Sequence, residues 1–133
     1  MIDQPVHIPE GVYIIRNAWD GRVLETEHRK PPPYVHAFLA SSRDGSSTHQ
    51  LWVVSSKQGR DREYIIQNMA TGAALDVFCG HVNDGTHVIC QAVHRKPNQT
   101  WSIFATRKAN LWVSIIESYR AFALQSRQLI TPY

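Results

Sequence analysis

Short runs of alternating apolar and polar residues recur along the chain, and a turn follows each of them. The runs VYIIRN (12–17) and EYIIQN (63–68) are rich in β-branched and aromatic residues with a period of two, which is typical of half-buried strands. Gly21 and Gly72 lie in the turns that follow and supply the positive φ that a tight hairpin needs. ALDVF, THVIC and TWSIF continue this rhythm, and no stretch shows a helical period. The pattern predicts an all-β chain.

The chain also repeats itself. Residues 11–25 align with residues 62–76 without a gap at an offset of 51. A Gln-x-Trp phrase follows in each copy, at an offset of 49. The matched pairs are Tyr13 and Tyr64, Asn17 and Asn68, Gly21 and Gly72, Leu24 and Leu75, Gln50 and Gln99, and Trp52 and Trp101. The recurrence of both tryptophans predicts that they lie in the core, and Gln99 is predicted to tie its repeat together beside the core ring.

A third copy is fainter. Residues 112–125 align with 63–76 at an offset of 49, but Gln125 replaces the acidic residue. The segment QLITPY (128–133) resembles THVICQ (86–91), and no third Gln-x-Trp follows. We therefore expect an incomplete third unit with exposed strand edges and an open barrel. A truncated chain, a partner that supplies the strand, or a shortened lobe each explain it, and we favour self-association as a homodimer.

Units of about 40–50 residues with four short strands cannot bury their own apolar faces, so they pack around a shared axis. Three four-stranded units predict a β-trefoil, because propellers typically need four or more blades. We expect a single domain over residues 1–133. Its repeats are predicted at 11–54, 62–104 and, in part, 111–133.

Composition and charge narrow the class of protein. The chain has 133 residues, 43% hydrophobic and 19% charged, and a net charge of +3 without a basic block, which argues against nucleic-acid binding. No apolar stretch is long enough to insert in a membrane, and the N-terminus lacks the features of a signal peptide. Two cysteines are too few for a disulfide framework. We expect a cytoplasmic protein.

The string Tyr-x-Ile-x-Asn…Gly-x-x-Leu-Asp…Gly-Thr-x-Val…Asn-Gln-x-Trp, at residues 64–101, resembles a repeat of the ricin B-type lectins. Without a cysteine framework or a signal peptide, the chain looks most like the small cytosolic lectins of mushrooms. The resemblance implies a β-trefoil haemagglutinin with a defensive role, no catalysis and no cofactor. It also implies shallow sites for galactoside, N-acetylgalactosamine or related glycans, up to one in each repeat, with glycans and glycoproteins as partners.

In such repeats the acidic residue after the leucine accepts hydrogen bonds from sugar hydroxyls, an aromatic ring stacks on the sugar, and the residue before Gln-x-Trp donates a further bond. In repeat two these positions predict Asp76 and Asn98 as the polar pair. The ring position falls at Gln91, which cannot stack, and His94 is the alternative ring. The other interpretation of Asp76 and Asn98 is that they only cap turns.

Repeat one has Glu25 at the acidic position, Phe38 at the ring position and His49 at the position of the asparagine. Tyr34, after the prolines, is a candidate second ring. In repeat three Gln125 replaces the acid and Tyr133 is the candidate ring, which predicts a degenerate site.

Three other chemistries compete. Cys79, His81, His87 and Cys90 could form a zinc set across a turn, or the two cysteines a disulfide, although the default is free thiols. No nucleophile, P-loop or metalloprotease motif occurs, so we do not expect an enzyme. The proline-rich segment RKPPPYVHAF (29–38) makes a protease inhibitor that acts through its loops the alternative function. Trp19, in a turn, is a further candidate for contact with a partner or glycan.

Overall fold

The structure is a computed structural model that describes residues 7–17, 20–29, 34–77, 88–105, 112–117 and 128–132. Within these ranges there are strands and two short 3₁₀ turns but no α-helix, which confirms the all-β prediction. The strands are β1 (Gly11–Asn17), β2 (Val23–Thr26), β3 (Val35–Ala40), β4 (Trp52–Ser56), β5 (Tyr64–Asn68), β6 (Ala74–Val77), β7 (Val88–Gln91), β8 (Trp101–Ala105), β9 (Trp112–Glu117) and β10 (Gln128–Pro132). The 3₁₀ turns are η1 (Thr48–Gln50) and η3 (Pro97–Gln99).

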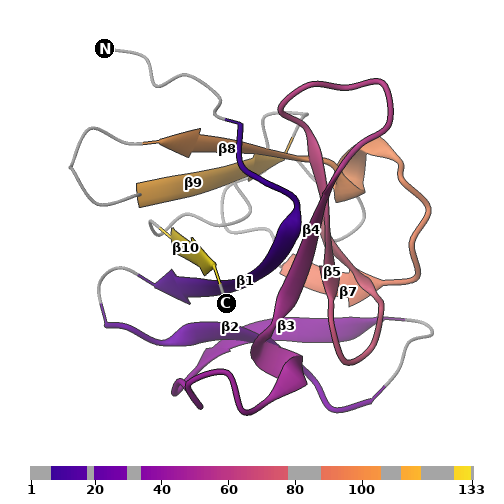
Figure 1. Cartoon of the computed structure of the whole chain (residues 1–133). Coiled ribbons are helices and arrows are strands. Elements are labelled where there is room, and N and C mark those ends of the chain that lie inside the picture. The colour runs from indigo at the N-terminus through magenta and orange to yellow at the C-terminus, as the bar shows by residue number, and fades with distance from the viewer. Residues whose placement is uncertain are drawn as a thin grey trace.

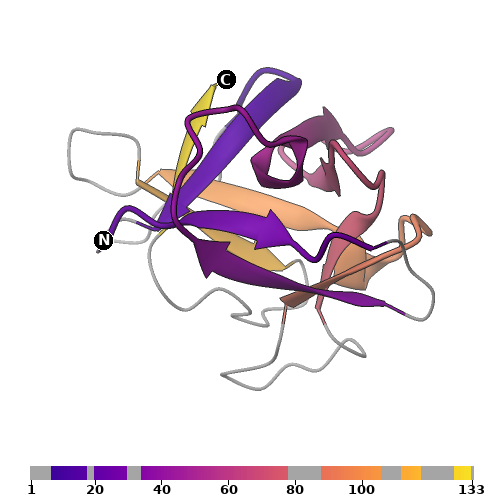
Figure 2. The same ribbon diagram turned by 90° about the horizontal axis from the view of Figure 1, so that it is seen from below.

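Six of the strands close into an antiparallel ring. Going round it, β1 pairs with β4, β4 with β5, β5 with β8, β8 with β9, β9 with β10, and β10 again with β1. The other four strands form the hairpins β2–β3 and β6–β7, which are joined to one another by a β3–β7 pairing. In Figure 2 the β2–β3 hairpin crosses in front of the barrel strands. A closed six-stranded barrel with hairpins at one end is the layout expected of a β-trefoil.

The expectation of an open barrel is wrong for the described strands. Strand β10 pairs with β1 over five residue positions, from Asn17↔Gln128 to Tyr13↔Pro132, and in Figure 1 it lies beside β1. It therefore has no exposed edge next to β1, and QLITPY does not take the place of THVICQ in a hairpin. An exposed edge beside β1 therefore no longer supports a homodimer. Self-association stays a prediction.

The strand register shows where the third unit is short. Trp52 pairs with Asn68 and Trp101 pairs with Glu117, and Gln128 takes the same place opposite Asn17. Residues 18–51 (34 residues) and 69–100 (32 residues) precede the two tryptophan positions, whereas only residues 118–127 (ten) precede Gln128. The segment between β9 and β10 is thus more than twenty residues shorter than the segments between β1 and β4 and between β5 and β8. The strand that closes the barrel, β10, is nevertheless present.

The core sits inside the barrel and under the hairpins. Alternate residues of the strands point inward, and Trp52 and Trp101 are both completely buried, as their recurrence predicts. Each indole N–H donates to a carbonyl of the neighbouring hairpin, from Trp52 to Leu24 and from Trp101 to Leu75, both at 3.0 Å. A buried indole needs such a partner, so each tryptophan fixes its hairpin to the barrel.

The turns after β1 and β5 are built alike. Gly21 and Gly72 have φ values of 74° and 73°, which confirms the predicted positive φ. They do not lie in two-residue hairpins, however, because the glycine N–H donates to the asparagine carbonyl four residues earlier, Asn17 or Asn68. The Asn68 side chain also accepts from the backbone of the turn and donates to the His49 carbonyl. The repeated asparagine therefore organises the turn.

Part of the proposed zinc set can be placed. Cys79, His81 and His87 lie outside the described residues, while Cys90 is a free thiol that packs in the core. Burial raises the pKa of the Cys90 thiol to about 12, so the thiol is protonated in the metal-free fold. No group of three or more metal-binding side chains occurs in the described part of the chain. In that same part no helix is long and apolar enough to cross a membrane.

Candidate functional site

A buried amide anchors the same network in both complete repeats. In repeat two Gln99 Nε2 donates to Asp76 at 2.9 Å and to the Ala92 carbonyl at 3.0 Å, while its Oε1 accepts from the His94 N–H. In repeat one Gln50 makes the equivalent bonds, to Glu25 at 2.7 Å, to the Ser41 carbonyl at 2.9 Å, and from the Arg43 N–H. The glutamine before each tryptophan thus joins a strand carboxylate to the loop that follows the hairpin.

These bonds locate the length difference between the repeats. The offset of 51 residues persists from Glu25 and Asp76 to Arg43 and His94, and it drops to 49 at the glutamines. The two extra residues of repeat one therefore lie between Arg43 and Gln50, just before η1.

In repeat two the predicted polar residues come together, but around an enclosed carboxylate. Asp76 is only 1% exposed. Its Oδ1 accepts from Asn98 Nδ2 at 2.8 Å, its Oδ2 accepts from Gln99, and His94 Nε2 lies 3.5 Å from Oδ2. Burial raises the pKa of the Asp76 carboxyl, and the bonds from Gln99, Asn98 and His94 oppose that rise. The carboxylate is occupied by the protein's own donors.

The strand register corrects the predicted ring position of repeat two. Phe38 on β3 pairs with Glu25 on β2, whereas Asp76 on β6 pairs with Ile89 on β7. Ile89, not Gln91, is thus the counterpart of Phe38, and it is buried. Gln91 pairs with Ala74, one step further from Asp76, and is half-buried. Repeat two therefore has no aromatic ring at the cross-strand position of its carboxylate, and the ring beside that carboxylate is the imidazole of His94, 3.5 Å from Oδ2.

Repeat one brings a carboxylate and three rings to one surface. Phe38 is 40% exposed, and as the cross-strand partner of Glu25 it stands on the same face of the hairpin. His28 Nε2 lies 3.0 Å from Glu25 Oε2, and the His28 ring stacks on His49 with centroids 3.9 Å apart and planes 14° apart. Glu25 itself is largely buried and anchored by Gln50. The arrangement is a polar base with flat apolar surfaces beside it.

The sequence profile described as "Ricin-type beta-trefoil lectin domain-like" matches residues 5–91 and 48–127. The chain belongs to this family. The overlap of the two matches reflects the internal repeat, since each spans more than one unit. A search of curated protein sequences found no match.

Solved structures agree with the family at the level of the fold. The designed threefold-symmetric protein ThreeFoil superimposes with a TM-score of 0.71 at 19% identity, covering 92% of this chain and 90% of its own. The Rhizoctonia solani agglutinin gives 0.70 at 13% identity, covering 98% and 91%. A Polyporus squamosus lectin, solved with a sialylated influenza-binding epitope, gives 0.66 at 19% identity, covering 96% of this chain and 46% of that one. At these identities the likeness shows the fold alone.

The sequence missed one member of the repeat-one surface of this ricin-type domain. His28 lies three residues after Glu25 in a charged segment that looks like a solvated loop. Its role depends on the turn after β2, which brings its ring onto His49, twenty-one residues further along the chain. Tyr34 packs edge-on against His36, with ring centroids 5.8 Å apart. Trp19, Gln125, Tyr133 and the three prolines lie outside the described residues.

His49 should make the fold sensitive to acid. Burial and the adjacent His28 lower the pKa of His49, and Glu25 only partly offsets them. The unfolded chain therefore binds a proton near the ordinary value of about 6.5 while folded His49 stays neutral, so stability falls as pH drops below that value. We expect His49→Asn, which copies residue 98, to lose less melting temperature between pH 7.0 and 5.5 than the natural chain. Equal losses in thermal melts of both proteins would contradict this role.

Proposed function

We propose that the chain binds carbohydrate at the surface of repeat one formed by Glu25, His28, Phe38 and His49, hereafter the repeat-one site. Membership of the ricin-type lectin family supports carbohydrate binding. The observation that carries the choice of site is the exposed Phe38 ring opposite a buried, oriented carboxylate. Galactosides and N-acetylgalactosamine-type glycans are the proposed ligand class, and a defensive role in the cytoplasm is the proposed setting.

The chemistry of a sugar fits this surface. A pyranose has an apolar C–H face, which packs on an aromatic ring, and hydroxyl groups that need fixed donors and acceptors. Phe38 supplies the ring. The Glu25 oxygens and the ring nitrogens of His28 and His49 supply the polar groups, and Gln50 keeps the carboxylate in place. A sugar hydroxyl competes with His28 for Glu25 Oε2, and the His28 side chain is half exposed and so free to adjust.

Repeat two is a weaker candidate for the same physical reasons. A sugar there would have to displace Asn98 from a nearly inaccessible carboxylate, and the cross-strand residue is buried Ile89 instead of a ring. Asp76 is also a poor probe of binding, because its removal leaves Asn98 Nδ2 without this acceptor and Gln99 Nε2 with only the Ala92 carbonyl. Loss of activity in an Asp76 variant would not separate binding from folding.

Phe38→Ala tests the proposal directly. Removing one stacking ring should weaken glycan binding about tenfold or more, since aromatic stacking contributes on the order of 1 kcal/mol beyond buried area. Its melting temperature should change little, because the side chain is exposed. Binding is measured on a glycan array and then by calorimetry with the best soluble sugar, which does not require multivalency.

Met69→Ala is the matched control. Met69 is a large apolar side chain, 47% exposed, in the turn after β5 and outside the repeat-one site. It should keep the natural affinity. If both variants bind alike, the site is elsewhere. If no glycan binds the natural chain while papain or trypsin is inhibited, the lectin proposal fails and the loop-based inhibitor replaces it.

A further inference from the structure

A pocket that is chemically different from the repeat-one site lies beside the hairpin between β4 and β5. It has a volume of about 470 Å³ and is lined by Ser55, Ser56, Lys57, Gln58 and Arg95. The first four residues come from the end of β4 and the hairpin after it, and Arg95 comes from the loop before η3. The volume falls within the usual range of small-ligand sites, roughly 300–1,000 Å³. None of these residues belongs to the repeat-one site.

Every lining side chain donates hydrogen bonds, and two of them carry positive charge. Within the described residues no carboxylate lies within ion-pair distance of Arg95 or Lys57. The nearby acids of the hairpin are matched elsewhere, Glu63 with Arg60 at 3.9 Å and Asp61 with Arg62 at 3.6 Å. Among the described residues, therefore, no carboxylate compensates the positive charge of the pocket.

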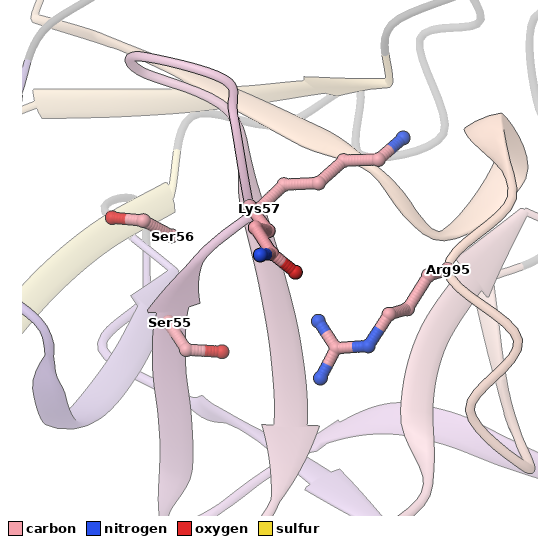
Figure 3. Close-up of a pocket in the computed structure, with 5 residues that line it drawn as sticks. Ser55, Ser56, Lys57 and Arg95 are labelled. Atoms are coloured by element: carbon pink, nitrogen blue, oxygen red, sulfur yellow. The ribbon is translucent and has the colours of Figure 1, made fainter.

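The two cations are held in different ways. Lys57 Nζ donates to Thr100 Oγ1 at 3.0 Å, and Thr100 is completely buried, so the ammonium is fixed at the edge of the pocket. The Arg95 backbone N–H donates to Gln99 Oε1 at 3.3 Å, which ties this loop to the buried amide network. In Figure 3 the Arg95 guanidinium and the Ser55 hydroxyl point toward each other across the pocket.

Arg95 has a left-handed backbone conformation, as the hairpin residue Arg62 also does with a φ of 62°. Arg95 has a φ of 59°, and its counterpart in repeat one, 51 residues earlier, is Asp44 with a φ of 51°. Asparagine, aspartate and glycine adopt this left-handed conformation most readily, and arginine has no such preference. Repeat one uses a favoured residue at the position, and repeat two accepts the cost of an arginine that faces the pocket.

We propose that this pocket binds the anionic substituent of an acidic glycan, a sulfate ester or a carboxylate. The planar guanidinium of Arg95 matches the paired oxygens of such a group, and the Ser55 hydroxyl that faces it in Figure 3 donates to a remaining oxygen. Lys57 adds a fixed charge. That the anion arrives on a glycan rests on the proposed function. The affinity for the anion rests on the pocket alone.

The test compares three probes with the full chain: lactose, 3′-sulfolactose and 3′-sialyllactose. At low salt, at least one acidic probe should bind about tenfold more tightly than lactose, and amide NMR shifts should appear at Ser55 and Arg95. Arg95→Gln should remove that preference and leave lactose affinity unchanged. Arg43→Gln, which removes an exposed charge from the corresponding loop of repeat one, is the matched control and should keep the preference.

The two acidic probes distinguish the two anionic groups. Tighter binding of 3′-sulfolactose indicates a sulfate ester, and tighter binding of 3′-sialyllactose indicates a carboxylate. A preference below about threefold for both probes, or one that survives in Arg95→Gln, overturns the inference. Failure of the proposed function looks different. In that case Phe38→Ala leaves lactose binding unchanged, while the acidic probe still shifts Ser55 and Arg95.

Discussion

Gln99→Glu should destabilise the fold by about 3–5 kcal/mol, the loss expected when a buried charged network is broken. The substitution barely changes shape, but it places a second carboxylate against Asp76 and the Ala92 carbonyl, where Gln99 now donates two bonds. The oxygen that replaces the amide nitrogen would then face two acceptors in a site that water does not reach, while the other oxygen keeps the N–H donors of His94 and Arg95. Urea unfolding at pH 7 measures the change in the free energy of unfolding.

Lowering the pH should restore part of that stability, because a proton shared between the introduced carboxylate and Asp76 returns one donor to the network. Gln67→Glu is the matched control. Gln67 makes one exposed bond, from Nε2 to the Gly72 carbonyl, so the same chemical change should alter stability by less than about 0.5 kcal/mol. Similar effects of the two substitutions would show that the amide beside Trp101 is not a structural anchor.

Local patterns in the sequence were enough to predict the strands, the paired tryptophans and the roles of Gln50 and Gln99. Each of these features recurs in both repeats because the fold needs the same residue type at the same place, such as a buried aromatic ring or a glycine with positive φ. The distinction between Asn98 and Gln99 also has a structural basis, since Gln99 is buried and joins strand to loop while Asn98 lies at the rim of Asp76. The ligand class and the site residues stay predictions.

The register of the hairpins could not be predicted from the sequence. The sequence shows that repeat one is two residues longer than repeat two. It does not show whether the two extra residues come before or after strand β3. Hydrogen bonding by Gln50 and Gln99 puts them after Arg43, which makes Ile89 the counterpart of Phe38. A shift of two residues keeps the same face of a strand, so the alternation of apolar residues gave no warning.

The position of the last strand, β10, could not be predicted for a related reason. QLITPY has the composition of any short strand, and its place depends on pairing with β1, more than a hundred residues earlier. The missing tryptophan removed the only local marker of the closing strand. Gln128 stands at the tryptophan position, so only the pairing partner identifies it.

Removing β10 should abolish the cooperative fold. A chain that ends at residue 127 loses five paired positions with β1 and two with β9, and β1 keeps one edge unpaired. At about one backbone hydrogen bond for each paired position and about 1 kcal/mol for each bond, the loss is about 7 kcal/mol, which is comparable to the whole stability of a small domain. Thermal unfolding followed by circular dichroism should show no cooperative transition, and sedimentation should show association through the exposed edges.

A chain that ends at Pro132 is the matched control, because it keeps all of β10. It should melt like the full chain. If the chain that ends at residue 127 melts within a few degrees of this control as a monomer, β10 does not hold the barrel closed. If it forms a well-folded dimer, pairing between the open strand edges of two copies has replaced β10. Closure within one chain therefore predicts that the control forms no dimer of this edge-paired kind, whatever other contacts bring two copies together.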